Sequence, residues 1–244
     1  MTAEHRQEQL LQLLQRLGLP PLANPQSLAN IDEALCHSSA GLARNHEQLE
    51  FLGDAVLRLA CAEFLQNHDA KLSVGDLSSL RAQLVSDRWL AELADQLQLE
   101  PLLLQGASAA GDGAGRATVL ADCCEALIGG VYQAWGGPAG GITAVRQWLD
   151  PHWQRSYAEL LKDPYRHNWK SALQEWSQAQ LGVLPHYSSE EQDRSHGNPR
   201  RFRSWVTIKE QLQGEGWGPS RREAEQHAAQ DALAKRKGVN PGPQ

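Results

Sequence analysis

The chain has 244 residues, of which 41% are hydrophobic and 21% charged, and its formal net charge at pH 7 is −6. This composition excludes collagen-like, low-complexity and wholly disordered proteins. No apolar run approaches the roughly 18 to 20 residues that a membrane helix needs, and the N-terminal segment is typical of an amphipathic helix rather than a signal peptide. We therefore expect a cytoplasmic protein with no membrane partner, whose four cysteines are reduced and buried.

The charge is divided unevenly along the chain. Residues 1–163 hold 11 Lys and Arg against 20 Asp and Glu, for a net charge of −9, whereas residues 164–244 hold 12 against 9, for a net charge of +3. This asymmetry predicts two domains with different tasks. The acidic part is suited to binding cations, and the basic part to binding polyanions.

The periodicity of apolar residues differs between the two parts. The first part has helical spacing and no alternating strand pattern, in residues 8–17, 47–65, 77–99 and 117–135. It is therefore predicted to be all-α. The second part predicts a small α+β domain of order α-β-β-β-α, with a helix at 168–181, extended stretches at 186–191, 201–208 and 211–216, and a helix at 220–235.

Two Asp-Pro dipeptides, at 150–151 and 163–164, flank a short helical piece between the two parts. The residue before a proline is disfavoured in a helix, so these dipeptides predict helix ends. We expect a first domain at residues 1–150, a linker at 151–163, a second domain at 164–238 and a tail at 239–244.

Acidic residues gather on one face of a predicted helix. Glu47, Glu50 and Asp54 are spaced i, i+3 and i+7, which places them on one stripe. Like charges in such a stripe destabilise a helix unless they are solvated, paired or bridged by a cation. A second pair, Asp122 and Glu125, lies in a helix with apolar neighbours on nearly every side. Acids in such surroundings need a partner.

Each acid by itself is most simply explained as a solvated surface residue. Two clusters embedded in apolar runs instead favour a bound divalent ion. Carboxylates without nearby His or Cys suit a hard ion, above all Mg²⁺, which Mn²⁺ could replace. Two such ions could activate a water and stabilise the leaving oxygen of a phosphodiester. No organic cofactor is expected, since the glycine-rich stretch at 111–115 lacks the rest of a phosphate-loop pattern.

The sequence can also be searched for the ligand patterns of other metal sites. No Glu is followed by His three residues later, which excludes the Glu-x-x-His pattern of a di-iron bundle. The segment at 46–50 is similar to a zinc-protease helix, but Glu50 stands in place of the second His. The pattern therefore argues against zinc.

The segment HEQLEFLGDAVL, at residues 46–57, resembles the signature of the ribonuclease III family, with Gln48 where the family usually has Arg. Further matches follow the family's order: ALCHSS at 34–39, LSSLRA at 77–82 and LADCCEALIG at 120–129. The second part is similar to a double-stranded-RNA-binding domain in NWKSALQEWSQ at 168–178, GEGWG at 214–218 and SRREAE at 220–225. The resemblance covers nearly the whole chain.

This resemblance implies a homodimer of all-α endonuclease domains that cleaves double-stranded RNA. The implied products carry 5′-phosphate and 3′-hydroxyl ends with short 3′ overhangs, and the implied substrates are ribosomal RNA precursors and other structured transcripts. By motif, Glu50, Asp54, Asp122 and Glu125 would form the Mg²⁺ site, with Asp54 and Glu125 least replaceable in catalysis. Glu47 would be an auxiliary acid.

The chain departs from the family pattern in three places. Gln48 implies a weaker ion pair beside the site, and Val74 stands where the family often has an acid, which puts one outer acidic contact in doubt. The loop of the second domain usually reads Gly-Pro-x-His, whereas here His196 and Asn198 flank Gly197. Either His196 or Asn198 could reach the minor groove.

A-form RNA displays its 2′-hydroxyls in a wide minor groove, so a duplex is read by shape and backbone. Gln174 and Gln178 lie four residues apart on one helical face and could hydrogen-bond those hydroxyls. Ser220, Arg221 and Arg222 open the last helix, whose positive dipole end would help the arginines to hold phosphates. A solvated basic face explains the arginines equally well without the resemblance.

Two rival functions remain open. A double-stranded-RNA binder that does not cleave would use the α-domain only to dimerise, although the presence of all four inner acids argues against it. A metal-dependent phosphodiesterase acting on DNA would be favoured if Gln174 and Gln178 proved irrelevant. Four tryptophans could stack on single strands, but their spacing is better explained by burial: Trp169, Trp176, Trp205 and Trp217.

Overall fold

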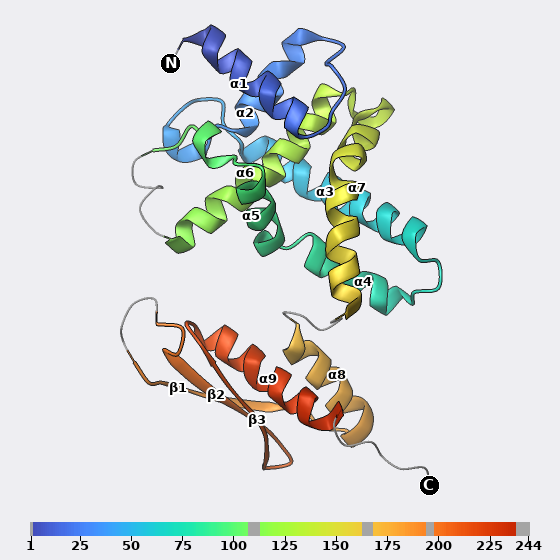
Figure 1. Cartoon of the computed structure of the whole chain (residues 1–244), viewed down its shortest axis with the longest axis vertical. Coiled ribbons are helices and arrows are strands. Elements are labelled where there is room, and N and C mark those ends of the chain that lie inside the picture. Colours follow the sequence, from blue (N-terminus) through green and yellow to red (C-terminus); the bar gives the residue numbers. More distant parts are fainter. Residues whose placement is uncertain (1, 107–112, 163–167, 194–197, 238–244) are drawn as a thin grey trace. The chain divides into compact units, whose positions relative to one another are not determined.

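The computed structural model describes residues 2–106, 113–162, 168–193 and 198–237. The chain divides into two compact units, Met1–Leu161 and Lys162–Gln244 (Figure 1). Within the described ranges, no helix is long and apolar enough to span a membrane.

The described residues of the first unit form helices and no β-strand, as the periodicity predicts. The α-helices are α1 (Ala3–Arg16), α2 (Leu28–Ala34), α3 (Glu47–His68), α4 (Val74–Leu84), α5 (Asp87–Gln96), α6 (Gly113–Ala134) and α7 (Gly141–Lys162). Short 3₁₀ helices span Pro25–Ser27, Ser38–Ala40, Glu100–Leu102 and Gly137–Ala139. Helices α3 and α6 lie against each other in the middle of this unit (Figure 1).

The helical spacing at 77–99 extends over two helices in the structure, α4 and α5. The break falls at Val85 and Ser86. The hydroxyl of Ser86 accepts a hydrogen bond from the Trp89 backbone N–H at 3.3 Å, which caps a new helix. A serine within a stretch of helically spaced apolar residues can thus start a new helix, although the spacing alone would predict that the first helix continues.

Residues 151–162, expected as linker, instead continue α7 through Pro151. A proline inside a helix removes a backbone hydrogen bond, at a cost of about 3 kcal/mol. Here the same helix buries Trp148 and Trp153 completely and Tyr157 and Leu160 nearly so. Burial of this apolar face on both sides of the exposed Pro151 outweighs that cost.

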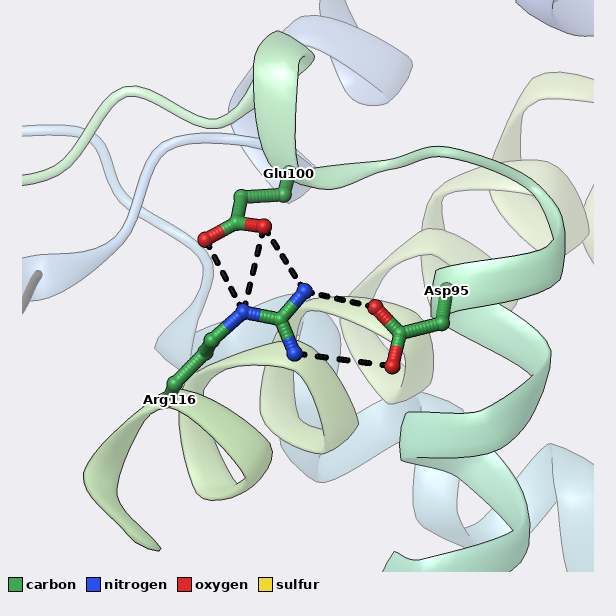
Figure 2. A network of polar contacts seen from close by, with 3 residues as sticks. All are labelled: Asp95, Glu100 and Arg116. Carbon is green, nitrogen blue, oxygen red and sulfur yellow. Dashed lines mark hydrogen bonds and ion pairs between the residues drawn. The ribbon is translucent and has the colours of Figure 1, made fainter. Parts of the chain in front are cut away.

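An ion-pair network holds the start of α6, shown in Figure 2. The Arg116 guanidinium on α6 pairs with Asp95 on α5 at 2.6 Å and with Glu100 in the following 3₁₀ turn at 2.7 Å. Because one guanidinium joins two carboxylates, the geometry of α6 relative to α5 is fixed by several hydrogen bonds. Helix α6 carries Asp122 and Glu125 farther along.

The second unit has the predicted order α-β-β-β-α. Its elements are α8 (Trp169–Leu181), β1 (His186–Glu191), β2 (Phe202–Ile208), β3 (Gln211–Gly218) and α9 (Arg221–Lys237). The strands form an antiparallel sheet in the order β1-β2-β3, and α9 packs on β2, β3 and α8. Glycines of β3 face α9 so closely that a Cβ at Gly216 would lie 2.2 Å from the Ala228 nitrogen.

Candidate active site and RNA-binding surface

Two glycines bring the acidic helices together. A Cβ at Gly53 on α3 would lie 1.9 Å from the Glu125 carbonyl oxygen, and one at Gly129 on α6 would lie 2.1 Å from the Leu49 carbonyl oxygen. The two backbones are therefore in direct contact, which only glycine permits. Gly53 stands immediately before Asp54, so the contact places the acids of α3 beside those of α6.

The electrostatics of these acids agree with that placement. Burial raises the pKa of Glu125 to about 7, and the neighbouring charges of Asp54, Glu50 and Asp122 add to it. Burial also raises the pKa of Glu50, with help from Asp122 and Glu47. The pKa of Asp122 is raised chiefly by burial. Burial is the largest cause for all three acids, and neighbouring carboxylates add to it.

Asp54 has a counter-charge from its own helix. Arg58, four residues later, donates to both carboxylate oxygens of Asp54, at 2.8 Å and 2.9 Å from Nε. Both side chains are substantially exposed, so the pair can open at little cost.

The donor set fits a hard divalent cation. Four carboxyl groups lie on the two helices that Gly53 and Gly129 join, and three of them carry a raised pKa that a cation would relieve. Oxygen donors of this kind are the ligands that Mg²⁺ takes in proteins. The residues of this cluster are Glu50, Asp54, Asp122 and Glu125.

Glu47 and two positions that depart from the family pattern, Gln48 and Val74, are all exposed. Glu47 opens α3 with an exposed side chain, close enough to Glu50 to raise its pKa. Gln48 is exposed beside it. Val74 is 79% exposed at the start of α4 and offers no oxygen ligand. The nearby Asp76 is held by Ser73 in a capping box.

Three residues that the sequence reasoning missed lie near the acids. Ring nitrogens of His37 and His46 lie with a carboxyl oxygen of Asp122 in one group, within 4.8 Å of one another. Asp87, the first residue of α5, helps to raise the pKa of Glu125 and Asp122. No sequence signal links His37 to His46, since His37 precedes a 3₁₀ turn and His46 precedes α3, and only the fold brings them together.

The residues predicted to bind RNA lie at the surface of the second unit where the structure describes them. Gln174 and Gln178 are exposed on α8, while Leu173 and Ser177 on the same helix are buried. The Ser220 hydroxyl accepts a hydrogen bond from the Glu223 N–H at 3.2 Å, so Ser220 caps α9.

Arg221 and Arg222 are exposed in the first turn of α9. His196 lies outside the described residues. The Asn198 side chain donates to Asp193 at 2.5 Å and accepts from the Arg200 N–H at 2.8 Å, so it is used within its own loop.

The four tryptophans of this unit are buried or partly buried, as their spacing predicts. Trp169 belongs to the core, and Trp176 packs against it. Trp205 and Trp217 face away from the helices, and the Arg203 guanidinium lies 4.9 Å from each ring centroid.

Known proteins match both units. The Ribonuclease-III-like family matches residues 29–147, and the double-stranded RNA binding motif matches residues 169–236. Ribonuclease 3 of Prochlorococcus marinus is 47% identical over 205 residues, which cover 84% of this chain and 81% of that protein. Ribonuclease 3 2 of Synechocystis sp. is 42% identical over 228 residues, covering 93% and 91%.

A solved nuclease domain of ribonuclease III from Campylobacter jejuni is 34% identical, with a TM-score of 0.48, and covers 56% of this chain and 94% of that one. The relatives match along nearly the full length of the chain, through the acidic helices and the RNA-binding unit alike. The chain therefore belongs to the ribonuclease III family of double-stranded-RNA-binding endoribonucleases.

Proposed function

We propose that this endoribonuclease holds Mg²⁺, which Mn²⁺ can replace, on Glu50, Asp54, Asp122 and Glu125. Hydrolysis of a phosphodiester in each strand of an RNA duplex leaves 5′-phosphate and 3′-hydroxyl ends with short 3′ overhangs. The observation that carries the proposal is the backbone contact at Gly53 and Gly129, which joins the two helices that bear these acids, together with the raised pKa of Glu125, to which Asp54, Glu50 and Asp122 contribute. Bound Mg²⁺ would supply Lewis acidity toward the phosphodiester and lower the pKa of a water nucleophile.

The chain's own residues prepare this site. Glu125, with its pKa near neutrality, must lose its proton before it can act as an anionic ligand. Asp54 accepts hydrogen bonds from Arg58, a partner that a bound cation would replace. Asp54 and Glu125 are therefore the catalytic residues of the proposal, and Glu47 is an auxiliary acid at the rim.

We propose that the second unit binds the duplex through the sugar-phosphate backbone of the RNA. Gln174 and Gln178, which are exposed, would bond 2′-hydroxyls, while Arg221 and Arg222 would contact phosphates at the start of α9. Ser220 fixes that helix start. His196 and Asn198 are proposed as alternative minor-groove contacts of the loop.

We further propose a homodimer formed through α3. Phe51, Ala55 and Leu59 are spaced i, i+4 and i+8 on the outer side of this helix, and Phe51 is 85% and Leu59 54% exposed. An apolar stripe of this kind on one helix favours a second copy as its partner. It adjoins Glu50 and Asp54, so dimerisation would bring two acidic sites to one duplex.

Ribosomal RNA precursors and other structured transcripts are the proposed substrates. The four cysteine thiols are all buried and free of disulfides, which supports a reducing compartment, and we propose the cytoplasm.

The test is incubation of the full chain with a long labelled RNA duplex in Mg²⁺ or in EDTA, beside Asp54→Asn and Glu125→Gln. We expect Mg²⁺-dependent shortening by the natural chain alone, with 5′-phosphate ends, and duplex binding by all three proteins. Tight binding without cleavage by the natural chain would identify a non-cleaving binder. Equal cleavage of a DNA duplex would identify a general phosphodiesterase.

A further inference from the structure

Beside the four carboxyl groups lies a second group of metal-binding side chains. His37 precedes the 3₁₀ turn at Ser38–Ala40, and His46 immediately precedes α3. Their ring centroids are 4.7 Å apart. A nitrogen of each ring and an oxygen of Asp122 lie within 4.8 Å of one another. Two imidazoles and a carboxylate thus converge from three separate elements.

One of these imidazoles has an unused nitrogen. His46 is 2% exposed, and its Nδ1 makes no hydrogen bond with any described residue. Its Nε2 lies 3.3 Å from Oε2 of Glu50. A buried polar atom without a partner requires an explanation, and a bound ion is one. The ring therefore has one buried nitrogen without a hydrogen-bond partner among the described residues, and one nitrogen of the ring belongs to the group with His37 and Asp122.

The other imidazole is held by Ser39 at Nδ1, which leaves Nε2 as the nitrogen for a metal. Nδ1 of His37 lies 2.7 Å from the Ser39 hydroxyl. Nδ1 also accepts a hydrogen bond from the Ser39 backbone N–H at 3.2 Å. A metal at Nε2 would require the ring proton to move to Nδ1, where the Ser39 hydroxyl can accept it and the backbone hydrogen bond is lost.

We propose that His37, His46 and Asp122 bind a transition-metal ion that prefers imidazole, such as Zn²⁺ or Co²⁺. Two nitrogen donors and one carboxylate suit such ions, whereas Mg²⁺ takes oxygen donors. Ligand atoms around a tetrahedral zinc ion are about 3.4 Å apart, so small side-chain rotations close the shell. This group is distinct from a zinc-protease helix, because its histidines come from two elements.

The position of Asp122 has a consequence for activity. It belongs both to this histidine site and to the proposed carboxylate site. An ion held by His37 and His46 therefore draws Asp122 away from Mg²⁺ and inhibits cleavage. The inhibition rests on the proposed function, whereas the binding does not.

Titration of the full chain with Co²⁺, followed by visible absorption, tests the binding. The natural chain is expected to develop an absorption band that saturates near one equivalent, that Zn²⁺ abolishes and that excess Mg²⁺ leaves in place. His46→Asn is expected to weaken Co²⁺ binding at least tenfold, and His37→Asn, which can keep the cap of the 3₁₀ turn, to do the same. His186→Asn, an exposed histidine of the second unit, serves as the control.

An unchanged titration in a folded Asn variant overturns the site, as does the absence of any band in the natural chain. Circular dichroism identifies a variant that has lost its fold. In that case the Co²⁺ titration of the other Asn variant decides whether the site exists.

RNA cleavage in Mg²⁺ with added Zn²⁺ tests whether the two sites share Asp122. Each variant is compared with its own rate without Zn²⁺. The Zn²⁺ concentration that halves the rate is expected to rise at least tenfold in His46→Asn and to stay unchanged in His186→Asn. Equal sensitivity in all proteins overturns the sharing of Asp122. A chain that binds Co²⁺ but never cleaves RNA contradicts the proposed function and supports the histidine site.

Discussion

Gly53 lies directly against Glu125: a Cβ atom at Gly53 would come within 1.9 Å of the Glu125 carbonyl oxygen. That oxygen is backbone, fixed within α6, so the helices must separate to admit a methyl group. The contact therefore controls both the packing of the core and the spacing of the acids on α3 and α6.

Gly53→Ala should consequently lower the free energy of unfolding and abolish Mg²⁺-dependent cleavage together. Overpacking at a close contact costs about 1–3 kcal/mol, and the backbone contact here places the loss at the upper end. Urea denaturation measures it. Gly75→Ala is the matched control, because its Cβ would meet only the Ser73 hydroxyl at 3.6 Å within α4. Equal stability of the two variants would contradict the proposed role of the contact.

Glu125 makes the stability of the metal-free protein depend on pH. Burial and its acidic neighbours raise its pKa from the ordinary 4.5 to about 7, so the folded state binds the proton more tightly than the unfolded chain. Its contribution is complete below pH 4.5 and is lost as the pH rises through 7, by up to about 3 kcal/mol before solvent screening reduces it. Glu125→Gln removes this loss.

We therefore expect Glu125→Gln in EDTA to gain stability relative to the natural chain between pH 4.5 and 7. Urea unfolding at several pH values measures the difference. In excess Mg²⁺ at pH 8 the natural chain should be more stable than Glu125→Gln, because only the natural chain retains the full set of ligands. A difference that stays constant with pH would show that Glu125 does not titrate in this range.

Much of the fold could be predicted because its signals are local. The helical periods at 47–65 and 117–135 correspond to α3 and α6, and the α-β-β-β-α order of the second unit is confirmed. The break at Ser86 and the passage of α7 through Pro151 could not be predicted in the same way. The first depends on one capping hydroxyl, and the second on burial of Trp153 by distant segments.

The acids could be proposed from the sequence because each pair shares one helical face. Their convergence across α3 and α6 depends on Gly53 and Gly129, which carry no periodic signal. The pairing of His37 with His46 depends on a loop whose path follows no pattern. Tertiary contacts of this kind appear only when the helices are packed.

Phe51 provides the test of the proposed dimer. Its side chain is 85% exposed in the single chain, so Phe51→Glu should leave the fold of one copy intact while it places a charge in the proposed interface. We expect sedimentation to show a monomer and circular dichroism an unchanged helix content. Leu212→Glu, at a residue 61% exposed in the second unit, should stay dimeric. A dimeric Phe51→Glu protein would exclude α3 as the dimer surface.

Binding by the second unit should separate hydroxyl contacts from phosphate contacts. Gln174→Ala should weaken binding to an RNA duplex about fivefold, for one lost hydrogen bond of about 1 kcal/mol, and should leave the weak binding of DNA unchanged. Arg222→Ala should weaken both and reduce the salt dependence by about one phosphate contact. Gln180→Ala, an exposed amide on another face of α8, is the control. Fluorescence anisotropy at several salt concentrations measures all three, and an equal loss on RNA and DNA for Gln174→Ala would contradict a role for the 2′-hydroxyl.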